Sequence, residues 1–217
     1  MGALRIRIVS VNVATPHLLG EENGEPVISA IAKKPVPGPM IEVGRINLKG
    51  DDQANRAVHG GPDKAVYSYP SDHWTWWERE KNFHCAPGAF GENLTLSGAD
   101  ETTVAIGDRF QWGDAVLEIA QPRVPCHKFI LYTGRDDAGA LMLTSGRCGW
   151  YFRVLTIGAA PVADASLNRV EESGGPTVRE TFQAAFGRQV TAERRSQIFE
   201  ARGLSDAWKK RLIAAGI

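Results

Sequence analysis

One cysteine has neighbours that could make it reactive. Cys126 lies in the segment Gln-Pro-Arg-Val-Pro-Cys-His-Lys at positions 121–128, directly after the apolar run at 116–120. The two prolines restrict their own φ angles and bias the preceding residues away from helix, which predicts a stiff, extended turn that presents the thiol. Arg123 and Lys128 place positive charge nearby, which favours the thiolate that attacks electrophiles or binds metals. The alternative is a cysteine that only packs in the core, and on this segment alone that interpretation is favoured.

A glycine turn upstream also carries basic residues. It lies within positions 50–65 and contains the run His59-Gly60-Gly61-Pro62-Asp63-Lys64. Two adjacent glycines followed by proline predict a tight turn with exposed backbone N–H groups, a geometry that suits an anion. The alternative is a plain loop in which His59 binds a neighbouring carbonyl group and Lys64 is solvated. Without other information the loop interpretation is favoured here too.

Two further segments combine glycines with polar side chains. The segment at 88–94 contains Glu92 and Asn93, which either orient a polar ligand or satisfy the ends of adjacent strands, the commoner case. In the segment at 146–154, Arg147 is a candidate for holding a phosphate group, and Arg153 is predicted to point outward from a strand.

Composition and charge exclude several classes of protein. The chain has 217 residues, of which 43% are hydrophobic, so it can bury a real core. Lysine plus arginine and aspartate plus glutamate both number 25, and a net charge of zero predicts binding neither to nucleic acid nor to an anionic membrane. No apolar run is long enough to cross a bilayer, and the N-terminal residues alternate instead of forming an apolar signal core. These features predict a cytoplasmic protein.

The cysteines argue against a disulfide framework. Cys85, Cys126 and Cys148 are odd in number and widely spaced, which fits a reducing compartment. The chain has no Cys-x-x-Cys motif, so a structural zinc site is not expected, and it has too few thiols for a usual iron–sulfur cluster.

Hydrophobic patterning predicts a β-rich domain that must position these side chains. Short β-like runs separated by glycine, proline and asparagine occur up to about residue 167. They lie at 6–13, 65–69, 93–96, 116–120 and 151–157. Short strands with frequent turns predict a mostly antiparallel barrel. One helix is expected to interrupt them at 71–81, with Ser71 as its N-cap and with Trp74 and Trp77 packed on the barrel.

The pattern becomes helical after the turn at 171–176. Thr177-Val178-Arg179-Glu180 has the form of a capping box and starts a helix that Gly187 can end. Two more helices are predicted at 191–202 and 205–215, with Gly203 and Gly216 as terminators. The chain is therefore expected to divide into a barrel domain at 1–167 and a three-helix extension at 168–217.

Taken in order, the segments resemble the MOSC domain (molybdenum cofactor sulfurase C-terminal), and within it the YiiM-like subgroup. The matching motifs are Ser29-Ala30-Ile31-Ala32-Lys33, Gly50-Asp51-x-Gln53, Val58-His59-Gly60-Gly61-Pro62-Asp63-Lys64-Ala65, Phe90-Gly91-Glu92-Asn93-Leu94, Ile106-Gly107-Asp108, Gln121-Pro122-Arg123-x-Pro125-Cys126-x-Lys128 and Gly149-Trp150. The resemblance spans nearly the whole chain, including the three-helix tail. Two departures are Asn55, where many relatives carry an acidic residue, and the pair Cys85 and Cys148, for which structural roles are expected.

The resemblance implies a MOSC-type β-barrel with flanking helices, a small C-terminal three-helix unit and a molybdenum cofactor. In this interpretation Cys126 is both the catalytic residue and the thiolate that ligates molybdenum, which a soft metal centre accepts well. The residues that the resemblance implies for cofactor binding are Lys33, His59, Gly60, Gly61, Asp63, Lys64, Asn93, Arg123, Lys128 and Arg147. The basic members of this set would face the phosphate group of the pterin. Because the resemblance spans nearly the whole chain, a functional Cys126 is now favoured over one that only packs in the core.

The resemblance also implies a function and its partners. Relatives look like oxidoreductases that reduce N-hydroxylated compounds, such as hydroxylaminopurine-type bases and amidoxime-like compounds, in detoxification. Because the chain has neither cluster cysteines nor a glycine-rich dinucleotide turn, a separate reductase is expected to deliver the electrons. A homodimer is possible through the helical tail.

Two other interpretations remain open. One is a cofactor or sulfur carrier, in which Cys126 holds a persulfide without catalysis of its own. The other is a cysteine hydrolase with His59 or His127 as base. The hydrolase is the weakest interpretation, because adjacent residues on an extended strand point to opposite faces and separate His127 from Cys126.

Overall fold

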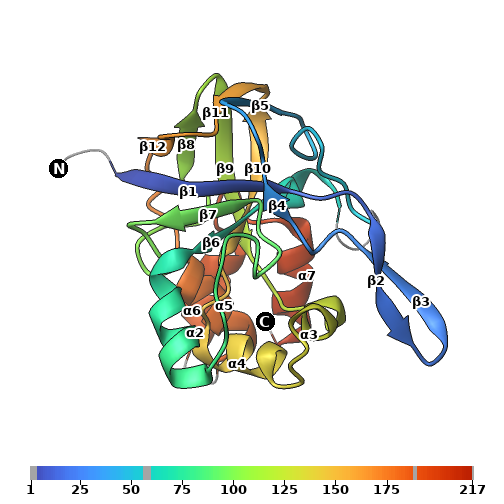
Figure 1. The fold of residues 1–217 in the computed structure, drawn as a ribbon. Helices are drawn as coiled ribbons and strands as arrows, with labels where there is room; N and C mark the ends of the chain where they lie inside the picture. The colour runs from blue at the N-terminus through green and yellow to red at the C-terminus, as the bar shows by residue number, and fades with distance from the viewer. Residues whose placement is uncertain (1–3, 56–59, 188–189, 217) are drawn as a thin grey trace.

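Seven strands close into a β-barrel in the computed structural model, which describes residues 4–55, 60–187 and 190–216 (Figure 1). Around the barrel the strand order is β12-β8-β9-β10-β6-β7-β1, and pairing of β12 with β1 closes it. The strands are β1 (Arg5–Val13), β6 (Val66–Pro70), β7 (Leu94–Ser97), β8 (Arg109–Trp112), β9 (Ala115–Pro122), β10 (Trp150–Thr156) and β12 (Ser166–Glu171). All neighbours are antiparallel except β6 and β7, so the expected, mostly antiparallel barrel is confirmed.

Alternating side chains fill the barrel. In β1, Ile6 and Ile8 are buried while Arg5 and Arg7 are exposed, as expected for a strand with one face on the core. The barrel strands also bury the aromatic side chains of Phe110, Trp112, Trp150 and Phe152. The five predicted strands correspond to β1, β6, β7, β9 and β10, and each is present.

Shorter strands lie outside the barrel. They are β2 (His17–Glu22), β3 (Glu25–Ser29), β4 (Lys34–Pro35), β5 (Met40–Val43) and β11 (Gly158–Pro161). Strands β2 and β3 form a hairpin that projects from the body of the protein, and β5 pairs with β11 (Figure 1). Strand β4 pairs with the end of β1 and so fixes the chain just after Lys33.

The first helix begins later than predicted. Residues Ser71–His73 form a 3₁₀ turn, η2, and the α-helix α2 covers Trp74–Lys81. Ser71 is not the N-cap, because its hydroxyl group donates a hydrogen bond to the carbonyl oxygen of Leu96 at 2.8 Å. Trp77 is fully buried and Trp74 is partly buried against the core, so their predicted packing is confirmed.

Two helices between β9 and β10 contradict the expectation of a single helix within the barrel domain. They are α3 (His127–Thr133) and α4 (Ala138–Ser145), and each ends at a glycine with positive φ, Gly134 or Gly146. They form because their residues find tertiary partners, including the buried Phe129 and Met142. None of the helices in the described ranges is long and apolar enough to span a membrane.

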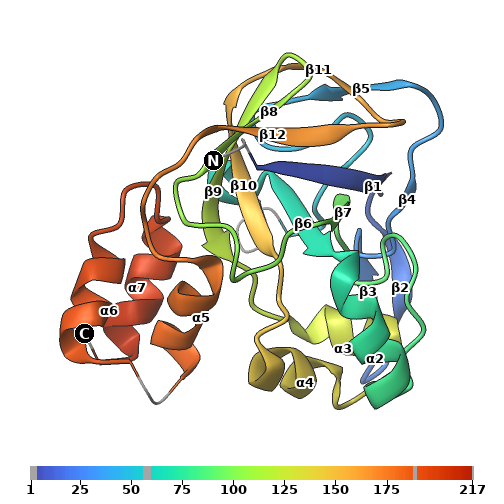
Figure 2. The same ribbon diagram turned by 90° about the vertical axis from the view of Figure 1, so that its left-hand side faces the viewer.

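The C-terminal extension contains the three predicted helices: α5 (Val178–Phe186), α6 (Ala192–Phe199) and α7 (Asp206–Ala214). The capping box of Thr177 and Glu180 is present, while α6 ends at Phe199 and not at residue 202. Figure 2 shows the three helices gathered at one side of the barrel, with α5 beside β9. The predicted boundary between the two domains, at residues 167 and 168, falls inside strand β12. The division into two domains stays a prediction.

Ser205 connects this extension to the barrel. Its backbone N–H group donates to the carbonyl oxygen of Ala120 at 3.0 Å, and its hydroxyl group donates to Gln121 Oε1 at 2.6 Å. The same hydroxyl oxygen accepts from Trp208 N and caps α7. One buried side chain therefore serves a helix end and a barrel strand.

We predict that Ser205→Ala costs about 2 kcal/mol of unfolding free energy, because it removes a helix cap and leaves a buried acceptor on Gln121 without this donor. The matched control is Thr191→Ala, which removes the exposed cap of α6 alone and should cost about 1 kcal/mol or less. Urea denaturation of both variants measures the difference. Equal losses would mean that the bond to Gln121 contributes nothing.

Candidate functional site

An open cavity lies beside Cys126, and its empty space is about 600 Å³ when the open solvent within it is included. Its walls come from the residues after β3, from the segment at 51–55, from β6 and β10, and from the segment at 123–128. Six of the residues that the sequence singled out line it: Lys33, Lys64, Asn93, Arg123, Cys126 and Lys128. Segments far apart in the sequence thus meet around one thiol.

Cys126 has the extended backbone predicted for it. Its φ and ψ angles are −111° and 164°, and it is the N-cap residue of α3, in the short segment that connects the end of β9 to this helix. The thiol is free and half-buried on the cavity wall. The adjacent His127 is exposed and pairs with Glu22 of β2 at 2.8 Å. His127 therefore has its own partner on the hairpin, which removes it as a base for Cys126.

Arg123 brings a buried positive charge to the cavity. Its guanidinium group stacks over Tyr67, 4.6 Å from the ring centroid, and over Phe129 at 5.2 Å. Burial acts to lower the pKa of Arg123, but Tyr67, Tyr151 and the Cys126 thiol raise it overall, so the group stays charged. Within the described ranges no carboxylate lies at ion-pair distance from it. A buried guanidinium group of this kind suits a bound anion.

Lys33 differs from Arg123 because its charge is balanced within the wall. Its ammonium group pairs with Asp51 Oδ1, which also accepts from Ala14 N at 2.9 Å. Asn93 Nδ2 donates to Asp51 Oδ2 at 2.9 Å, and Asn93 Oδ1 accepts from Tyr67 N at 3.1 Å. Burial lowers the pKa of Lys33 even though Asp51 favours its charged form. The three side chains form one rigid polar network on the cavity wall.

Lys64 and Lys128 add cations at the edges of the cavity. Lys64 ends the short 3₁₀ turn η1 (Pro62–Lys64), and burial together with the charge of Arg211 on α7 lowers its pKa. Lys128 Nζ donates to the carbonyl oxygen of Ile28 on β3. Both side chains line the cavity, so positive charge faces it from several elements.

Other predicted site residues lie elsewhere. Asp63 pairs with Arg153 on β10 at 2.8 Å, and Arg153 also binds Glu118, so this arginine is not a free outward side chain. The guanidinium group of Arg147 stacks over Trp76 at 4.6 Å. Neither Asp63 nor Arg147 is among the described residues that line the cavity.

The glycine turn is only partly described. His59 lies outside the described residues. Gly61 has a φ of +98°, which glycine adopts readily, yet neither Gly60 nor Gly61 belongs to the described lining of the cavity. Cys85 and Cys148 are buried away from it, in keeping with the structural roles expected for them.

Asp51, Tyr67 and Tyr151 are among the lining residues that sequence reasoning did not name as site residues. The two tyrosines occupy paired positions on β6 and β10, with ring centroids 5.1 Å apart. Nothing local in the sequence pairs these strands. Asp51 lay within the quoted Gly50-Asp51-x-Gln53 motif, and that motif was the available signal.

We predict that the tyrosines resist ionisation in the folded protein. Burial is the largest cause that raises the pKa of all four: Tyr67, Tyr69, Tyr132 and Tyr151. A raised folded pKa means that this contribution to stability is complete below the unfolded value of about 10 and is lost as pH rises beyond it. The unfolding free energy should therefore fall above about pH 10.

Phenolate absorbance measured against pH in the native and denatured protein checks this prediction. We expect the native protein to titrate at higher pH than the denatured protein. Coincident titration curves would contradict the burial of these hydroxyl groups.

Comparisons with known proteins agree with this architecture. The MOSC domain model matches residues 55–166. The chain is 37% identical over 204 residues to protein YiiM of Escherichia coli (strain K12), which covers 92% of this chain and 89% of that protein. It is 35% identical over 139 residues to a protein of Gibberella moniliformis named "Reductase", covering 62% of this chain but 24% of that protein.

A solved structure has the same fold. The crystal structure of YiiM from Geobacillus stearothermophilus superposes with a TM-score of 0.80 at 31% identity, covering 97% of this chain and 98% of that one. The family model covers most of the barrel strands, and the relative and the solved structure also extend into the helical tail. The chain therefore belongs to the MOSC domain family, which is associated with the molybdenum cofactor, and within it to the YiiM-like proteins.

Proposed function

We propose that this protein binds the molybdenum cofactor in the Cys126 cavity and reduces N-hydroxylated compounds there. The observation that carries the proposal is the meeting of a half-buried thiol with the buried Arg123, which has no carboxylate at ion-pair distance within the described ranges. A cofactor that offers both a soft metal and a phosphate group would satisfy both side chains at once.

The residues present fit such a group. Cys126 would ligate the metal, since a thiolate suits a soft centre whose other ligands come from the pterin. Arg123, Lys64 and Lys128 would balance the negative charge of the pterin phosphate. Lys33 would serve less as a counter-charge, because Asp51 already balances it. With Asn93 it would instead offer hydrogen bonds at fixed positions.

The proposed reaction converts an N-hydroxylated compound, two electrons and two protons to water and the dehydroxylated product, which is an amine from a hydroxylamine and an amidine from an amidoxime. When bound, the cofactor supplies the two-electron redox chemistry for breaking the N–O bond. Lys33 is a cavity residue suited to giving a proton, because burial lowers its pKa and makes the ammonium group a stronger acid. Asp51 and Asn93 hold that ammonium group in place, and the stacked Arg123 keeps the cavity positive.

Other molecules must take part in this reaction. A separate reductase would deliver the electrons, and the fungal relative named "Reductase", of which this chain covers 24%, supports redox chemistry for the family. The three free cysteines support placing the protein in the cytoplasm. The small-molecule substrate class and a homodimer through the helical tail stay predictions.

A carrier function is the second candidate. The thiol of Cys126 is half-exposed at an open cavity, which is also what a persulfide carrier requires. In that case the cations would hold a cofactor or a sulfur donor for transfer, and the chain would not turn over a substrate.

We predict that protein purified from a host that synthesises the cofactor contains molybdenum and that Cys126→Ala holds less than roughly a tenth as much. Loss of a residue that only supports a metal ligand often costs ten- to a hundredfold in affinity, so loss of the ligand should cost at least as much. Cys85→Ala is the control, because Cys85 is also a free thiol but does not line the cavity. Elemental analysis measures both.

If the purified protein is free of metal and Cys126 carries labile sulfur, the carrier function replaces the reductase function as the proposal. Equal molybdenum contents in the wild type and Cys126→Ala would remove Cys126 as the ligand.

We predict that cofactor-loaded protein with a chemical reductant converts a hydroxylaminopurine to the aminopurine and an amidoxime to the amidine, consuming two electrons for each product molecule formed. Cys126→Ala treated in the same way should form none. Chromatography of the product, together with titration of the reductant, measures the ratio. If loaded wild-type protein leaves both compounds unchanged, the reductase proposal fails and the carrier remains.

A further inference from the structure

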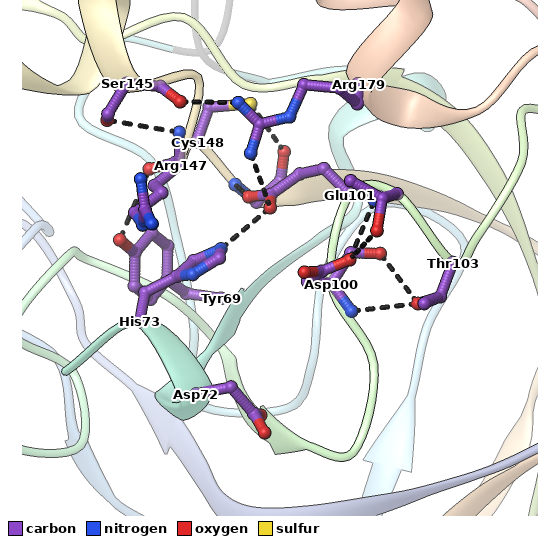
Figure 3. A network of polar contacts seen from close by, with 12 residues as sticks. Tyr69, Asp72, His73, Asp100, Glu101, Thr103, Ser145, Arg147, Cys148 and Arg179 are labelled. Carbon is purple, nitrogen blue, oxygen red and sulfur yellow. Dashed lines mark hydrogen bonds and ion pairs between the residues drawn. The ribbon is translucent and has the colours of Figure 1, made fainter. Parts of the chain in front are cut away.

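A fully buried carboxylate lies in a polar network that the proposed reaction does not use. Glu101 follows β7, and Figure 3 shows its side chain among His73, Arg179 and the backbone of Cys148. Glu101 Oε2 lies 2.7 Å from His73 Nε2 and 3.9 Å from Arg179 Nη2. Glu101 Oε1 accepts a hydrogen bond from the backbone N–H group of Gly149 at 2.7 Å. Glu101 is not among the described residues that line the Cys126 cavity.

The backbone segment that Glu101 holds also contacts the cavity. The carbonyl oxygen of Gly149 accepts from Arg123 N at 3.2 Å, and the carbonyl oxygen of Cys148 accepts from the Tyr67 hydroxyl group at 2.9 Å. Tyr67 is the residue on which the Arg123 guanidinium group stacks. The successive carbonyl groups of Cys148 and Gly149 thus bind Tyr67 and Arg123, the two residues of the stacked pair. Glu101 binds the N–H group of Gly149, which lies between these two carbonyl groups in the chain.

This segment needs an anchor because of its backbone conformation. Gly149 has a φ of +66°, and a Cβ atom at this position would lie 2.2 Å from the carbonyl oxygen of Ser68. Glycine is therefore required here, and glycine is also the residue with the greatest backbone freedom to lose on folding. The hydrogen bond that Gly149 N donates to the buried Glu101 side chain restricts that freedom.

Glu101 connects the same segment to the C-terminal extension. Its own carbonyl oxygen accepts from Arg179 N in the first turn of α5 at 2.7 Å, and Val178 N donates to the carbonyl oxygen of Val104 at 3.0 Å. Arg179 also donates to the carbonyl oxygen of Ser145, at the end of α4. The loop that carries Glu101 is therefore fixed between the extension and the cavity wall.

We infer that Glu101 is a positioning residue for anion binding, acting through Cys148 and Gly149 on the stacked pair of Arg123 and Tyr67. The inference rests on the proposed function, because it takes Arg123 as the group that holds the anionic part of the cofactor. Its consequence is that a side chain outside the cavity sets the anion affinity of the cavity.

Calorimetric titration of the full-length protein with inorganic phosphate tests the inference without any metal. Glu101→Gln keeps an oxygen that accepts from Gly149 N, so it should bind phosphate within about threefold of the wild type. Glu101→Asp keeps the charge but retracts the carboxylate by one methylene, and it should bind roughly tenfold more weakly, because a buried N–H group loses its acceptor. Arg123→Ala should abolish binding. Both Glu101 variants are conservative, which favours their folding.

Asp108→Asn is the matched control. Asp108 is also fully buried and also binds the start of the extension, accepting from Ser173 N at 2.9 Å, but it does not touch Cys148 or Gly149. It should bind phosphate as the wild type does, even where its unfolding free energy falls as far as that of Glu101→Asp. If Asp108→Asn weakens phosphate binding as much as Glu101→Asp does, Glu101 acts only through general stability and the inference is overturned.

The remaining outcomes are equally decisive. Three results would each overturn the inference. Glu101→Asp could bind phosphate with wild-type affinity, Glu101→Gln could bind it more weakly than Glu101→Asp, or the wild type could fail to bind phosphate. If the expected order is found but wild-type protein from a cofactor-synthesising host holds no molybdenum, the proposed function fails and the positioning role stands. If molybdenum is present and the Glu101 variants bind phosphate as the wild type does, the inference fails while the proposed function stands.

Discussion

The stacking of Arg123 between aromatic rings is the interaction on which the candidate site depends. A guanidinium group is costly to bury, and here the rings of Tyr67 and Phe129, together with the hydroxyl group of Tyr67, take the place that a carboxylate usually fills. This arrangement requires β6 to bring Tyr67, the end of β9 to bring Arg123, and α3 to bring Phe129. The same turn from β9 into α3 presents Cys126. The closed barrel therefore brings the parts of the site together.

The charges of the two buried cations, Lys33 and Arg123, are balanced in different ways. Lys33 is neutralised by Asp51, which Asn93 and a backbone N–H group hold in turn, so this side of the wall is complete without a ligand. Arg123 has aromatic faces instead, and these leave its charge directed at whatever enters. An anion gains most beside Arg123, while Lys33 contributes directional hydrogen bonds. This division gives the cavity both an attractive and an orienting part.

Local features of the sequence predicted much of the fold and part of the site. Caps and strands depend on neighbouring residues, so the capping box at Thr177 and the extended turn at Cys126 could be read directly. Tyr67 and Tyr151 could not, because they meet only through the pairing of β6 with β10. Basic character alone did not predict where Arg147 packs: its guanidinium group stacks on Trp76, because a side chain's charge does not specify the element against which it packs.

The helical extension matters to the site through the strand that it touches. Ser205 bonds to Ala120 and Gln121 at the end of β9, directly before the turn that carries Arg123. Arg179 reaches the other support of that arginine through Glu101. A short three-helix unit is marginal alone, so it must gain its stability from these contacts with the barrel. The same contacts make the geometry of the cavity sensitive to the packing of the extension, which gives the chain a structural reason to keep both parts together.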